Sequence, residues 1–173
     1  FNATVTNNAG GTISKGAFKS SVENNALGTI AGGTFQSGCS VKNYGTIKDN
    51  GTFEGTVTNS GTINGNGTFN GTVTNEGANA TIKNGTFEQE VINNDGGEIS
   101  GGTFKGTVLN GNAIITGGTF AAGLSRNDGS VTGGVFNGKT GLTTKAHQVT
   151  VTNGSVSQVN GEGPRKEDGT PGT

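Results

Sequence analysis

The most regular feature of the chain is a column of phenylalanines that recurs about every 17 residues. Successive members are 17, 17, 18, 16, 18, 17, 16 and 16 residues apart. Two further apolar columns share this period: Val or Leu usually follows each Phe by four residues, and Ile or Val precedes the next Phe by five or six. Such self-similarity is typical of repeat proteins. The column contains every Phe of the chain: Phe1, Phe18, Phe35, Phe53, Phe69, Phe87, Phe104, Phe120 and Phe136.

Each repeat predicts three short β-strands separated by turns. Phe, Val and Ile favour strands, whereas the Gly, Asn and Asp between them favour turns. The even spacing from Phe to Val keeps both side chains on one face of an extended segment, but the usual spacing of five from Ile to Phe requires a turn. Gly stands two residues before each of the last eight Phe, from Gly16 to Gly134, and supplies the backbone freedom for that turn.

A repeat this short cannot close a core alone, but stacked copies can, because each coil pairs its backbone with its neighbours. We therefore predict an all-β fold, a parallel β-solenoid (β-helix) of about eight coils of about 17 residues, with three short strands per coil. Helices are disfavoured because apolar residues do not recur at spacings of three and four residues. A β-sandwich would need longer strands joined by hairpin turns. We expect the solenoid over 1–136, a final coil or cap over 137–160, and a polar tail or linker over 161–173.

An Asn column accompanies the apolar columns, six residues after Phe in most repeats. Asn side chains can hydrogen-bond to the same residue one coil away, but Asn is also a common turn residue, and both interpretations stay open. The predicted structural ladder joins Phe18, Phe35, Phe53, Phe69, Phe87, Phe104, Phe120 and Phe136 with Asn59, Asn75, Asn93 and Asn110; Asn7 and Asn24 share the Asn spacing.

Composition narrows the class of protein. Gly (35), Thr (27) and Asn (22) make up almost half of the 173 residues, and apolar residues are only 28%. A globule with one thick core is therefore disfavoured. Eleven basic and twelve acidic residues nearly cancel, so the chain has no positive electrostatic field that would attract nucleic acid. No apolar run is long enough for membrane insertion.

Candidate chemistry is sparse, and we expect no enzyme, cofactor or metal site. The single His, His147, cannot build a serine triad or a His-based metal site. Cys39 falls four residues after Phe35, in the Val position, and is expected to be a buried small side chain. Asp95 and Asp128 both lie eight residues after a Phe, but their Asn-Asp-Gly contexts favour turns over a catalytic pair.

The outward-facing side chains of successive repeats are predicted to form solvent-exposed columns along the solenoid. Glu88 and Lys105 follow successive Phe and are expected to pair weakly across one coil. Thr-Val-Thr occurs in three repeats, which suggests ice binding only as a third hypothesis. Tyr44 is the one candidate for an exposed aromatic residue.

The recurring Gly-Gly-Thr-Phe and Gly-Thr-Ile units resemble the Gly-Gly-apolar repeats of bacterial right-handed parallel β-helix surface proteins, with autotransporter passengers and related adhesins as the nearest group. The resemblance covers about residues 1–136. It implies an extracellular, cell-surface, non-enzymatic protein, and it transfers no functional residue.

The leading hypothesis is a structural or adhesive segment of a surface fibre or filament, and the alternative is a carbohydrate-binding or carbohydrate-processing β-helix. Because Phe1 already occupies the Phe position, the first coil is expected to present an open strand edge. Open edges pair with other strands, so we expect self-association through the coil ends. Surface glycans or host proteins are the other expected partners.

Overall fold

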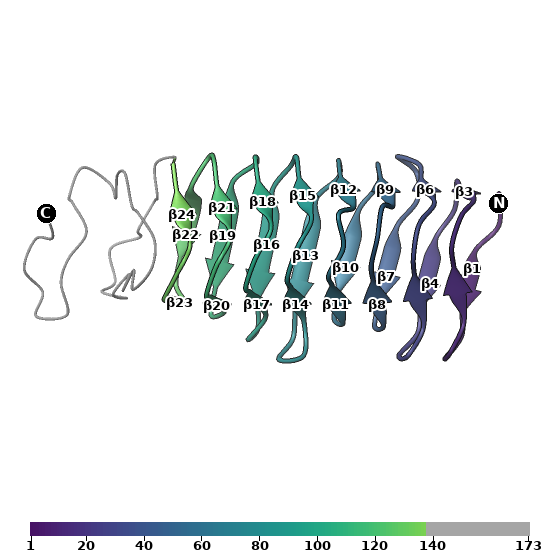
Figure 1. Ribbon diagram of the computed structural model, residues 1–173, viewed down its shortest axis with the longest axis horizontal. Helices are drawn as coiled ribbons and strands as arrows, with labels where there is room; N and C mark the ends of the chain where they lie inside the picture. The colour runs from purple at the N-terminus through teal and green to yellow at the C-terminus, as the bar shows by residue number, and fades with distance from the viewer. Residues whose placement is uncertain (138–173) are drawn as a thin grey trace, which may run out of the picture.

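The computed structural model describes residues 1–137, which form 24 short parallel strands wound into eight coils (Figure 1). Each coil contributes one strand to each of three eight-stranded sheets, and coil 1 is made of β1, β2 and β3. The predicted parallel β-solenoid with three strands per coil is thus confirmed. Apart from Asn137, the segments 137–160 and 161–173 lie outside the described residues.

The valine sheet is built from the tripeptide Val-x-Asn. Val and Asn point inward and the residue between them points outward, as a period of two requires; in β10 the outward Thr58 is half-buried while Val57 and Asn59 are buried. The strands are β1 (Val5–Asn7), β4 (Val22–Asn24), β7 (Val41–Asn43), β10 (Val57–Asn59), β13 (Val73–Glu76), β16 (Val91–Asn94), β19 (Val108–Gly111) and β22 (Leu124–Asn127).

The isoleucine sheet comes from the Gly-Thr-Ile units. Its strands are only two residues long because the chain turns on both sides of them, and Ile or Val is the inward residue. The strands are β2 (Thr12–Ile13), β5 (Thr29–Ile30), β8 (Thr46–Ile47), β11 (Thr62–Ile63), β14 (Thr81–Ile82), β17 (Glu98–Ile99), β20 (Ile114–Ile115) and β23 (Ser130–Val131).

The phenylalanine sheet closes each coil. The turn before it uses the predicted glycine column: six of these eight glycines have positive φ, for example Gly85 at 130°. Gly51 and Gly67 are the exceptions, and there the Ile-to-Phe spacing is six instead of five. The strands are β3 (Ala17–Phe18), β6 (Thr34–Phe35), β9 (Thr52–Phe53), β12 (Thr68–Phe69), β15 (Thr86–Phe87), β18 (Thr103–Phe104), β21 (Thr119–Phe120) and β24 (Val135–Phe136).

The core is one narrow column along the axis of the rod, where each coil places a Val or Leu, an Ile or Val and a Phe. From Phe18 onward these side chains are at most 2% exposed. Backbone bonds run from coil to coil in strict register; Thr68 N–H, for example, donates to the Gly51 carbonyl at 2.9 Å. Burial and backbone pairing are therefore supplied by neighbouring coils, which explains how so small a repeat folds.

The assignment of Cys39 to the Val position was wrong. Val41 occupies that position, because it pairs with Val22 on one side and Val57 on the other. The turn between β6 and β7 is two residues longer than the spacing of four assumes. Inward side chains and backbone pairing set the register, so the extra residues are held in the turn.

Candidate functional site

The phenylalanine rings form one continuous stack. Centroids of successive rings are 4.5–4.8 Å apart and the rings are within 11° of parallel from Phe1 to Phe136. Every ring except that of Phe1, which is 65% exposed, is buried. The spacing matches that of the strands, so the backbone ladders dictate the stack.

A second continuous file is made by buried asparagines of the valine sheet. In coils 1 to 7 Nδ2 donates to Oδ1 of the Asn one coil further on, at 2.6–2.8 Å, which gives seven consecutive bonds. The same Nδ2 usually donates to a carbonyl at the nearby corner, as Asn59 does to Gly61 at 3.0 Å. The side chains thus hydrogen-bond to one another and do not merely mark turns. The members are Asn7, Asn24, Asn43, Asn59, Asn75, Asn93, Asn110 and Asn127.

Counting from Phe missed two members, Asn43 and Asn127. Asn43 follows the longer turn that contains Cys39, and Asn127 follows an extra residue in β22, where the register with β19 shifts after Val108. The tripeptide Val-x-Asn marks Asn43 directly as Val41-Lys42-Asn43 and was the better signal.

The ladder has a direction. All seven bonds point from the N-terminal coil to the C-terminal one, so the last member, Asn127, accepts from Asn110 at 2.7 Å. Its own Nδ2 is buried without a hydrogen-bond partner among the described residues.

Cys39 is buried at 2% exposure in the turn before β7. Desolvation by burial raises the pKa of its thiol, and a hydrogen bond from the Val22 backbone opposes this in part. A buried thiol with a raised pKa is a poor nucleophile and a poor metal ligand.

Charged side chains lie on the outside of the coils. The expected pair of Glu88 and Lys105 is confirmed, with Oε1 and Nζ 2.7 Å apart on the phenylalanine sheet. Asp95 adopts positive φ (51°), as its turn context predicted. It lies two residues after its ladder Asn, whereas Asp128 lies one residue after Asn127, so the two carboxylates do not occupy equivalent positions in their coils.

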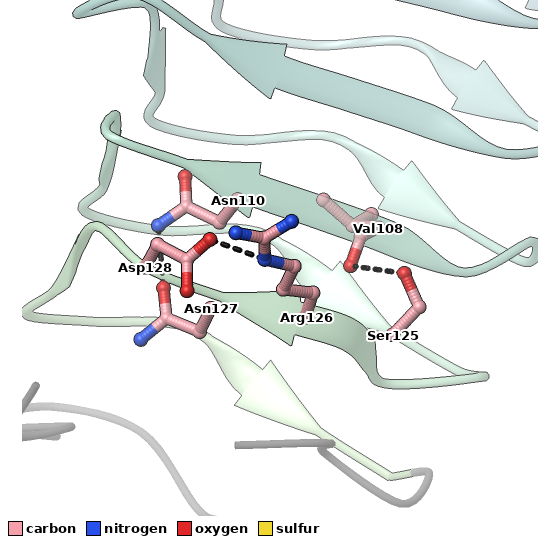
Figure 2. A network of polar contacts seen from close by, with 6 residues as sticks. All are labelled: Val108, Asn110, Ser125, Arg126, Asn127 and Asp128. Carbon is pink, nitrogen blue, oxygen red and sulfur yellow. Dashed lines mark hydrogen bonds and ion pairs between the residues drawn. The ribbon is translucent and has the colours of Figure 1, made fainter. Parts of the chain in front are cut away.

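The outer surface is irregular at the corner between the valine and isoleucine sheets in coils 6 to 8. The bulge in β22 leaves both Ser125 and Arg126 exposed, and the Arg126 guanidinium pairs with the carboxylate of Asp128 (Figure 2). Beside them lies a groove of about 540 Å³ that is largely open to solvent. It is lined by Gly96, Asn112, Ala113, Ile114, Asp128, Gly129 and Ser130.

The remaining candidate residues are scattered. Tyr44 is 47% exposed at the same corner of coil 3, and His147 lies outside the described residues. Across residues 1–137, His, Cys, Asp and Glu never gather in groups of three or more that suit a metal ion. The same range contains no helix long and apolar enough to cross a membrane.

Comparisons of the chain with protein-family models, with curated proteins and with solved structures found no match.

Proposed function

We propose that this chain is a non-enzymatic structural segment of an extracellular fibre, a stiff β-solenoid that presents a polar surface to its surroundings. The observation that carries the proposal is the uninterrupted core: the phenylalanine stack and the Asn ladder run through all eight described coils. A rod whose coils are each bonded to both neighbours resists bending and local opening. Across residues 18–137 the inward positions are filled by buried Val, Leu, Ile, Phe and Asn side chains.

The outer surface supports the same role. Outward positions of the isoleucine sheet carry Thr in five successive coils, and those of the phenylalanine sheet carry Thr in six. Such side chains keep a thin rod soluble without a large field of either sign. The valine sheet lacks the regular Thr pairs of an ice-binding face, because Glu23 and Lys42 interrupt its outward column.

End-to-end association is part of the proposal. The strands of successive coils pair in parallel throughout all three sheets, and a strand edge of this kind pairs readily with the matching edge of another coil.

The proposal is tested in the cells that produce the protein. Antibodies against the purified chain are expected to label intact cells, and immunogold electron microscopy is expected to show the label on thin fibres. Labelling confined to permeabilised cells contradicts the extracellular assignment. Label at the surface without fibres contradicts the fibre assignment alone.

Carbohydrate binding is the second candidate. The exposed ring of Tyr44 is the observation in its favour, since a sugar ring can stack on an aromatic face. A glycan array with saturable binding that is lost in Tyr44→Ala would establish it.

A further inference from the structure

The outer surface of coils 6 and 7 departs from the polar pattern of the rod. On the isoleucine sheet the outward residue is Thr in coils 1 to 5. In coil 7 it is Ile114, whose side chain is an exposed large hydrophobic group with 43% relative exposure of the residue. On the valine sheet the outward Thr58 and Thr74 give way to Ile92 and Leu109. These aliphatic side chains are not needed by the core, which lies on the opposite face of each strand.

The groove includes Ile114 in its lining. Leu109 lies on β19 of the same coil, and its side chain leans along that strand toward Gly111, with Cδ2 3.2 Å from the place that a Cβ on Gly111 would occupy. Asn112, which also lines the groove, has positive φ (48°), a conformation that Asn adopts readily in turns. Arg126, in the bulged strand β22, pairs with Asp128 of the lining. Bulges are enriched beside functional sites.

Charge around the groove is unbalanced. On the valine and isoleucine strands of coils 6 to 8 and on the corners between them, three carboxylates, those of Asp95, Glu98 and Asp128, face one guanidinium, that of Arg126. Glu98 is the register neighbour of Ile114, and its carboxylate accepts a hydrogen bond from Thr116 Oγ1 at 3.0 Å. Asp95 directly precedes Gly96 of the lining. The strands and corners beside Ile114 therefore carry a local net charge of −2.

We propose that this groove binds a short extended segment of a partner protein that alternates Leu-like side chains with Lys or Arg. The aliphatic side chain packs against Ile114, and the flanking cations meet Asp95 and Glu98. A peptide is favoured over a sugar because no aromatic residue lines the groove. The inference goes beyond the fibre proposal, since it concerns the purified chain and holds or fails wherever the protein is located.

The test uses the full 173-residue chain and three fluorescein-labelled heptapeptides, Gly-Lys-Leu-Lys-Leu-Lys-Gly and its versions with Glu for Lys or with Thr for Leu. Fluorescence anisotropy is expected to show saturable binding of the first peptide, at least about tenfold tighter than either of the others. Raising the salt from low to physiological concentration is expected to weaken it severalfold.

Matched variants locate the site. Ile114→Thr, and separately the double variant Asp95→Asn with Glu98→Gln, are each expected to weaken binding about fivefold or more while circular dichroism stays unchanged. Val135→Thr and, separately, the double variant Glu54→Gln with Glu88→Gln make comparable changes at exposed or half-buried positions of the phenylalanine sheet and are expected to leave binding unchanged. No saturable binding, equal binding of all three peptides, or equal losses in the control variants would overturn the proposal. So would glycan-array binding that Ile114→Thr abolishes, since it would make the groove a sugar site.

Discussion

The side chain of each ladder Asn serves two coils at once. Asn75 accepts from Asn59 at 2.7 Å and donates to Asn93 at 2.8 Å, and it is fully buried. Asn93 is buried as well, so removal of the Asn75 amide leaves the Asn93 Oδ1 without its donor.

Asn75→Ala is therefore expected to destabilise the protein by about 1–3 kcal/mol. The measurement is a urea unfolding curve followed by circular dichroism, with Asn79→Ala at the exposed corner of the same coil as the control. Equal midpoints for the two variants would show that the ladder contributes nothing to stability.

Cys39 gives a pH-dependent prediction at the same scale. Burial raises the pKa of its thiol, so the folded chain holds the neutral form at a pH where the unfolded chain begins to ionise. The resulting stabilisation is present below the pKa of the unfolded thiol and is lost as the pH rises above it. The urea midpoint of the wild type is expected to fall more between pH 7 and pH 9.5 than that of Cys39→Ala. Parallel falls in both proteins would contradict the assignment.

At the scale of the element, the strands tolerate extra residues only where inward side chains keep their register. β22 shows this: its bulge adds Ser125, yet Leu124 still pairs with Val108 and Asn127 with Asn110. The extra residue is exposed, and only the outward part of the strand changes.

Deletion of Ser125 is accordingly expected to be tolerated, because Leu-Arg-Asn reproduces the Val-x-Asn spacing of the other seven strands. Deletion of Thr74 in β13 is the opposite case, since it turns Asn75 to the outer face and breaks the ladder. Thermal melts are expected to show little change for the first deletion and a loss of several degrees or more for the second. Similar melting temperatures for both would mean that the register does not depend on the inward residues.

The difference between inward and outward residues also explains which features the sequence predicts. The Phe and Ile columns locate most strands, because those side chains must recur with the coil. Counting from Phe assumes a constant number of residues, so it misplaced Cys39, which lies in a longer turn, and Asp128, which follows the bulge in β22. Val41 and Asn127 nevertheless hold the register. The groove could not be predicted from the sequence, because it depends on how the corners of three successive coils lie against one another.

At the scale of the whole molecule, stability is additive along the axis. Within residues 1–137 each strand pairs only with the matching strands of the adjacent coils, so the rod is treated as a row of nearest-neighbour units.

Duplication of one coil tests this additivity. A tandem copy of residues 57–72 inserted after Thr72 brings one more inward Val, Asn, Ile and Phe in the right order. If coils are interchangeable units, small-angle scattering should show a rod about 5 Å longer, and the melting temperature should rise because one more interface is buried. An insert with the same sixteen residues in scrambled order is the control, and it is expected to loop out without lengthening the rod. A duplicated coil that behaves like the scrambled insert would mean that each coil is specified by its place in the chain, and the account of the fold as independent stacked repeats would fail.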